Sequence, residues 1–179
     1  MNVSTLRLFN IIGYQLAWFA CVMGAAWDFA WAGVAFALAV TAVHLLLFRN
    51  PRELRLVLCA AAIGFIVDTS LVRAHLVEFE STTSSGVAPL WMVSLWLVFA
   101  TTLNHSLRWL TSRPWAAALT GAVGGPLAYL AGAKLGALSI ASPLPAAFTF
   151  IAFLWAMALG LLCVLNGVRD VAVKGRLPA

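Results

Sequence analysis

The chain of 179 residues is 63% hydrophobic and only 9% charged, whereas a soluble globular domain typically carries about 25% charged residues. There is too little polar surface to cover a water-soluble globule, so the composition indicates an integral membrane protein. The formal net charge of +5 matches a membrane protein that keeps its basic residues on one side of the bilayer, and we expect no binding of nucleic acid.

Six hydrophobic runs follow one another along the chain, each long enough to cross a hydrocarbon core of about 30 Å as an α-helix. They fall near residues 8–26, 30–48, 55–76, 89–110, 115–135 and 145–166. A proline lies at or just before the start of each of the last four runs, where its missing N–H costs no helical hydrogen bond. These prolines are Pro51, Pro89, Pro114 and Pro145. The sequence therefore predicts an all-α fold, a single transmembrane domain built as a bundle of six spanning helices.

The distribution of basic residues predicts the orientation of these helices, because cytoplasmic loops retain Lys and Arg. With the N-terminus inside, the cytoplasmic segments hold Arg7, Arg49, Arg52, Arg55, Arg108, Arg113, Arg169, Lys174 and Arg176, and the outer segments hold Arg73 and Lys134. We therefore expect a multi-pass protein of a bacterial inner (plasma) membrane with both termini in the cytoplasm.

Polar side chains inside the spans are costly in hydrocarbon and mark candidate sites. The half nearer the cytoplasm contains five that we predict to form a lipid or ligand pocket: Tyr14, Gln15, His44, Asn104 and His105. The alternative is a set of separate hydrogen bonds between helices. Neither histidine has a carboxylate or thiolate at ligand spacing on its own helix, so the sequence predicts no metal site and no cofactor.

Two charged residues nearer the outer side form a candidate buried ion pair. Asp68 in the third run and Lys134 in the fifth fall at similar depth. The alternative is that Lys134 extends to the outer interface while Asp68 is protonated or is bonded by Thr69, Ser70 or a backbone group.

Small residues recur at three- and four-residue steps along the fifth run. Gly121, Gly125, Gly132 and Gly136 would share one face of a helix. Such a face allows another helix to approach closely. We predict that these glycines serve helix packing.

Three stretches carry a family resemblance: Asn10 to Phe19 (NIIGYQLAWF), Pro89 to Leu110 (PLWMVSLWLVFATTLNHSLRWL) and Gly121 to Ala137 (GAVGGPLAYLAGAKLGA). They resemble an uncharacterised family of small bacterial inner-membrane proteins, a domain of unknown function, over almost the whole chain. Relatives are often encoded near lipid-modifying genes, so the resemblance implies a membrane-lipid context. It implies no catalytic residue.

Three functions are compatible with these features, and the sequence does not decide whether the protein is an enzyme. The first is a lipid-handling protein or an accessory to membrane-lipid modification or envelope stress response, with membrane lipids and a membrane protein or second copy of the chain as partners. The second is an intramembrane enzyme acting on a lipid through His105 and His44 as acid and base. The third is a small secondary transporter using Asp68 and Lys134.

Overall fold

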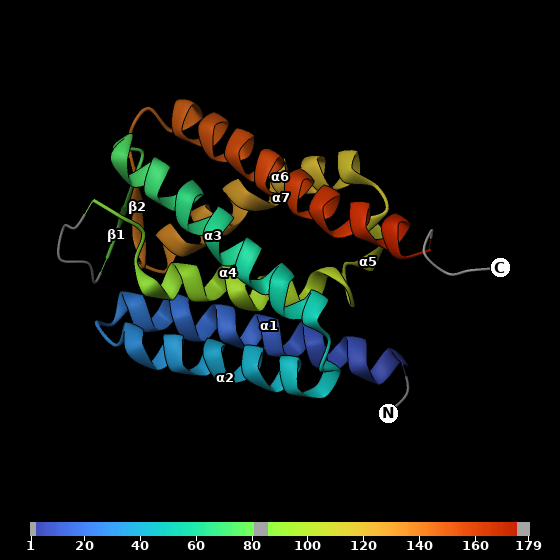
Figure 1. The fold of residues 1–179 in the computed structure, drawn as a ribbon. Helices are drawn as coiled ribbons and strands as arrows, with labels where there is room; N and C mark the ends of the chain where they lie inside the picture. The colour runs from blue at the N-terminus through green and yellow to red at the C-terminus, as the bar shows by residue number, and fades with distance from the viewer. Residues whose placement is uncertain (1–2, 81–85, 175–179) are drawn as a thin grey trace.

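The chain folds into a bundle of helices with a short two-stranded sheet at one end, as a computed structural model shows (Figure 1). The structure describes residues 3–80 and 86–174, with side chains over 7–80 and 86–167. Its helices are α1 (Val3–Ala26), α2 (Ala30–Phe48), α3 (Pro51–Arg73), α4 (Leu90–Leu103), α5 (Arg108–Thr111), α6 (Pro114–Lys134) and α7 (Leu144–Lys174). The strands β1 (Val77–Phe79) and β2 (Leu138–Ile140) pair antiparallel. The predicted all-α fold class is confirmed.

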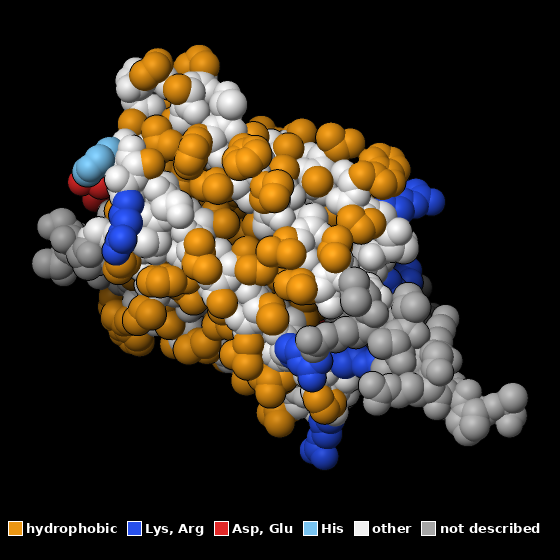
Figure 2. All heavy atoms as spheres, turned by 45° about the horizontal axis from the view of Figure 1, so that its top comes forward, with side chains coloured by type: hydrophobic (Ala, Val, Ile, Leu, Met, Phe, Trp, Pro, Cys, Tyr) orange, Lys and Arg blue, Asp and Glu red, His pale blue; other side chains and the backbone are white. Residues whose placement is uncertain are grey.

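Long apolar helices identify the class of protein. In the described part of the chain, five helices are long and apolar enough to cross a membrane: Arg7–Ala26, Ala30–Phe48, Pro51–Arg73, Pro114–Lys134 and Leu144–Gly167. Many large hydrophobic side chains on them face outward, with Leu58 58% and Ile66 64% exposed. Figure 2 shows a face covered mainly by hydrophobic side chains, with charged side chains toward its edges. Lipid is the environment that such a surface requires, so the protein is a multi-pass membrane protein.

The fourth hydrophobic run differs from the prediction. Helix α4 has 14 residues, which at 1.5 Å per residue gives about 21 Å, less than the thickness of a hydrocarbon core. The chain then forms a turn in which the amides of His105 and Leu107 both donate to the carbonyl of Thr102, at 3.1 and 2.8 Å. The prediction of one continuous helix over residues 89–110 is therefore wrong. The six-span topology stays a prediction. Two side chains of this turn bond to other helices, Asn104 to Glu53 of α3 and Ser106 to Asn10 of α1.

The helices alternate in direction, so their ends gather in two places (Figure 1). At one end α1, α3 and α6 begin and α2, α4 and α7 finish. We call it the basic end, because it carries Arg7, Arg49, Arg52, Arg55, Arg108 and Arg113. The opposite end, which we call the strand end, holds the β1–β2 pair and the turn between α1 and α2. The predicted charge bias includes three further basic residues whose side chains are outside the described part of the structure: Arg169, Lys174 and Arg176.

Helix α3 begins at Pro51 instead of near residue 55. The side chain of Asn50 accepts a hydrogen bond from the amide of Arg52 at 3.0 Å, and Pro51 occupies the first helical turn. Asn50 thus caps a helix whose first turn is preorganised by proline. The early start places Glu53 inside the bundle instead of in a loop.

Glycines allow close contact between helices at several points. A Cβ atom at Gly121 would overlap the backbone of Trp155, and one at Gly125 would overlap its side chain, so α6 lies directly against α7. Gly132 faces Leu138 of β2. Gly136 differs from the prediction, because α6 ends at Lys134 and Gly136 forms the following turn with a φ of 82°, a left-handed conformation that favours glycine.

Candidate functional site

A buried carboxylate forms the centre of a polar cluster at the basic end. Glu53 is 5% exposed. Its Oε2 lies 3.3 Å from His44 Nε2, and its Oε1 accepts a hydrogen bond from Asn104 Nδ2 at 3.0 Å and lies 3.5 Å from His105 Nε2. Asn166 Nδ2 donates to Asn104 Oδ1 at 2.6 Å. We call these five residues the Glu53 cluster.

The Glu53 cluster joins four parts of the fold. His44 comes from the last turns of α2, Glu53 from the first turn of α3, Asn104 and His105 from the turn after α4, and Asn166 from α7. A buried carboxylate costs several kcal/mol unless it is paired and hydrogen-bonded. The partners of Glu53 therefore both stabilise the carboxylate and hold these helices together.

An aromatic ring covers the two histidines. The Phe48 ring centroid lies 4.1 Å from that of His105 and 4.7 Å from that of His44, and the two imidazoles are 4.9 Å apart. Phe48 is the last residue of α2, so the end of this helix positions the ring. The three rings therefore pack together beside Glu53.

A second polar network lies beside the cluster and joins α1 to the α4 region. Asn10 Nδ2 donates to the carbonyl and to Oγ1 of Thr101, at 3.2 and 3.3 Å. Ser106 Oγ donates to Asn10 Oδ1 at 2.6 Å. Together with the Glu53 cluster, this network concentrates polar side chains at the basic end of an otherwise apolar bundle.

An apolar groove of about 180 Å³ leads to these polar residues between α1 and α2. Its apolar walls include Phe9, Gly13, Val40 and Leu47, and its polar members are Asn10, His44 and Thr101. His44 therefore belongs both to the groove and to the Glu53 cluster. A groove with apolar walls and a few hydrogen-bonding groups in its lining is suited to an amphipathic ligand.

The five residues predicted to form one pocket divide into two groups. His44, Asn104 and His105 meet at Glu53, but Tyr14 packs against Phe99 with ring centroids 5.9 Å apart, and Gln15 is exposed. The prediction of a single pocket is wrong for Tyr14 and Gln15, because depth along a helix does not fix rotation about it, and neighbouring positions diverge by about 100°.

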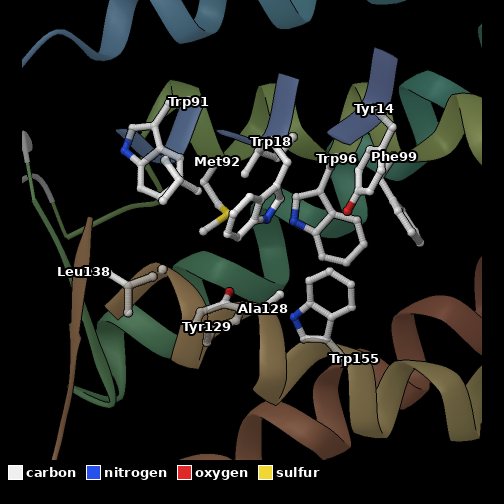
Figure 3. Close-up of a pocket in the computed structure, with 13 residues that line it drawn as sticks. Tyr14, Trp18, Trp91, Met92, Trp96, Phe99, Ala128, Tyr129, Leu138 and Trp155 are labelled. Carbon is white, nitrogen blue, oxygen red and sulfur yellow. The ribbon is translucent and has the colours of Figure 1, made fainter. Parts of the chain in front are cut away.

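Tyr14 instead lines an aromatic cavity nearer the middle of the bundle (Figure 3). Aromatic side chains from α1, α4, α6 and α7 surround it, including Trp18, Trp96, Tyr129 and Trp155. Trp96 and Trp155 stack with ring centroids 4.5 Å apart. The cavity measures about 40 Å³, which is room for a few water molecules at most. It is too small for a lipid.

Asp68 lies fully buried beside these rings. It accepts hydrogen bonds from Trp96 Nε1 at 2.9 Å and from the hydroxyl of Tyr129. Lys134 is exposed in the last turn of α6, and within the described part of the chain no ion pair joins it to Asp68. The predicted ion pair is wrong, because Tyr129, more than one turn earlier on α6, reaches the depth of Asp68. The transporter hypothesis loses the pair on which it was based.

Sequence reasoning missed Glu53, although a signal for it is present. Arg52 and Arg55 on either side made the segment resemble a charged loop. Asn50 with a glutamate three positions later, however, is a pattern typical of a helix N-terminus. A helix starting at Pro51 puts Glu53 at the same end of the bundle as His44. Glu53 would then have supplied the carboxylate that the two histidines lacked.

Fold and site together define a multi-pass helical membrane protein with a buried polar cluster at one end of its bundle. The chain belongs to the family described as "Protein of unknown function (DUF2878)", whose family model matches residues 7–161. The match includes every member of the Glu53 cluster except Asn166. The expected membership of an uncharacterised family is confirmed. No curated protein and no solved structure matches the chain.

Proposed function

We propose that the protein is a lipid-handling protein of the bacterial inner membrane, multi-pass with both termini in the cytoplasm, and that it binds an anionic phospholipid at its basic end. The observation that carries this proposal is the groove between α1 and α2, which is apolar along its walls and polar where it meets Asn10, His44 and Thr101. One acyl chain occupies the groove, and the head group lies at the basic end.

Charge complementarity supports an anionic head group. Arg7 and Arg49 are exposed at the ends of α1 and α2, the two helices that form the groove. Guanidinium groups form strong, often bidentate hydrogen bonds with phosphate, and basic residues near a membrane surface attract anionic lipids by about 1 kcal/mol each. If a membrane protein partner takes the lipid from this groove, the protein acts as an accessory to membrane-lipid modification.

Filling the groove tests the proposal. Ala39 lines the groove and is exposed, whereas Ala35, one turn earlier on α2, is exposed outside it. Protein purified in mild detergent is analysed by native mass spectrometry and by extraction of bound lipid. Ala39→Trp is expected to lose most of the co-purifying phospholipid, while Ala35→Trp keeps it. Equal lipid content in the wild type and both variants would contradict the proposal.

A second candidate function is enzymatic, with His105 and His44 acting on the bound lipid as acid and base. The observation that favours it is that His44 lines the groove and also contacts Glu53. A reacting group at the end of the groove would then lie beside an imidazole oriented by a carboxylate, an arrangement suited to proton transfer. Incubating the protein with phospholipid vesicles and following lipid masses tests this function. Unchanged lipids, with wild type and His105→Gln indistinguishable, would exclude it.

A further inference from the structure

We propose that His44, Glu53 and His105 bind a divalent transition-metal ion of the Zn²⁺ type at the basic end of the bundle. The proposal goes beyond lipid binding and does not depend on it. It rests on the convergence of two imidazole nitrogens and a carboxylate from three different parts of the chain. Their ligand atoms all lie within 4.8 Å of one another.

The distances between the histidine nitrogens and Glu53 are compatible with ligands of one ion, and they are longer than strong charge-assisted hydrogen bonds. His44 Nε2 lies 3.3 Å from Glu53 Oε2, and His105 Nε2 lies 3.5 Å from Glu53 Oε1. Charge-assisted hydrogen bonds between nitrogen and carboxylate are typically about 2.7–2.9 Å. Ligands about 2.0–2.2 Å from a tetrahedral Zn²⁺ are about 3.3–3.6 Å from each other. The His105 nitrogen is buried and makes no hydrogen bond of good geometry within the described residues.

The kinds of ligand indicate the kind of ion. Imidazole nitrogen and carboxylate oxygen suit Zn²⁺ and the neighbouring divalent ions, and two histidines with one carboxylate leave a coordination position open. None of the three described cysteines takes part in the three-ligand group. A Zn²⁺-type ion with at least one open position is therefore the expected occupant.

The surroundings of the three ligands also resemble those of a metal site. Ligating carboxylates are usually held by further hydrogen bonds, and Asn104 donates to Glu53 while Asn166 donates to Asn104. The His105 side chain is 20% exposed, so this ligand lies near the surface at the basic end. One divalent ion would contact all three ligands and balance the charge of the buried Glu53 carboxylate.

Metal binding by the full chain in detergent tests the proposal. The protein is stripped with EDTA, dialysed against Zn²⁺ or Co²⁺, and its metal content is measured. We expect one ion per chain and a visible Co²⁺ absorption typical of nitrogen and oxygen ligands. His105→Gln and Glu53→Gln are expected to weaken binding by at least tenfold. The matched control is His75→Gln, which changes the remaining histidine, exposed at the strand end, and should bind as the wild type does.

The outcomes separate the metal site from adventitious binding. Zn²⁺ should raise the unfolding temperature of the wild type and of His75→Gln but not that of His105→Gln. Failure of the wild type to bind one ion would overturn the proposal, and this test does not depend on whether the variants fold. Sulfur-to-cobalt charge-transfer absorption, or a loss of binding in His75→Gln alone, would overturn it as well. Lipid content in the Ala39→Trp experiment is a separate readout, so either proposal can fail alone.

Discussion

Trp96 interacts with α3 at two points one turn apart. Its indole nitrogen donates to Asp68 Oδ2 at 2.9 Å, and its ring lies over Gly64, where a Cβ atom would overlap it. Gly64 and Asp68 are four residues apart and share a face of α3. One side chain of α4 thus fills the gap left by a glycine and donates a hydrogen bond to a fully buried carboxyl group.

Removing the indole donor is expected to destabilise the bundle. Trp96→Phe retains a ring over Gly64 but leaves Asp68 with one hydrogen-bond donor fewer, and an unsatisfied buried polar group costs about 1–3 kcal/mol. Thermal unfolding in detergent measures the effect. Trp31→Phe is the control, because Trp31 is 65% exposed and its replacement should leave the unfolding temperature nearly unchanged. Equal stability of the two variants would contradict the role of the Trp96–Asp68 bond.

Two adjacent glycines of α6 should respond differently to the same substitution. Gly125→Leu places a side chain into Trp155, whereas a Cβ at Gly124 meets nothing within 4 Å. Overpacking typically costs about 1–3 kcal/mol and sometimes more, so Gly125→Leu should lower both the yield of folded protein and its unfolding temperature. Gly124→Leu should resemble the wild type. A similar loss in both variants would mean that side-chain bulk on α6, and not its contact with α7, causes the effect.

The order of hydrogen bonds in the Glu53 cluster predicts a graded response. Asn104→Ala removes one donor to Glu53 and also the acceptor of Asn166, so two polar groups each lose a hydrogen bond. We expect a loss of about 1–3 kcal/mol, measured by thermal unfolding without added metal. Asn166→Ala removes only the outer bond and should cost less. A larger loss of stability in Asn166→Ala than in Asn104→Ala would contradict this order of the hydrogen bonds.

Cysteine labelling checks the orientation. Ser112 lies exposed between α5 and α6, and Ser139 lies exposed in β2 at the other end of α6. In a chain with Cys59 replaced by Ala, a membrane-impermeant maleimide should label Ser139→Cys on intact spheroplasts and Ser112→Cys only after lysis. The reverse pattern would invert the orientation that the basic residues predict. Labelling of both from one side would show that α6 does not cross the membrane.

Hydropathy was sufficient to predict most helices but not where they are interrupted. Residues 30–48 form the helix expected of them, and the fifth run is displaced by a single residue. The turn after Leu103 lies within an apolar run, and its residues Asn104 and Ser106 bond to residues of other helices. Window averages over the sequence contain no information about such long-range partners.

The same limit applies to the candidate site. Counting along the helices placed His44, Asn104 and His105 at the same depth, and they do meet. Depth could not reveal that Gln15 faces outward, because helix rotation depends on packing. Lys134 and Asp68 illustrate the same point, since similar depth did not bring them into contact.

The two ends of the bundle are held by different kinds of bond, and this difference predicts where the sequence can vary. At the strand end, main-chain pairing of Val77 with Ile140 and of Phe79 with Leu138 links the α3–α4 connection to the α6–α7 connection. Any residue with an amide and a carbonyl can make such bonds. At the basic end the link depends on the side chains of Glu53, Asn104 and Asn166, which few other residues could replace. Substitutions should therefore accumulate at the exposed strand positions Glu78 and Ser139, and rarely in the Glu53 cluster or at Val77, Phe79 and Leu138, whose side chains are buried.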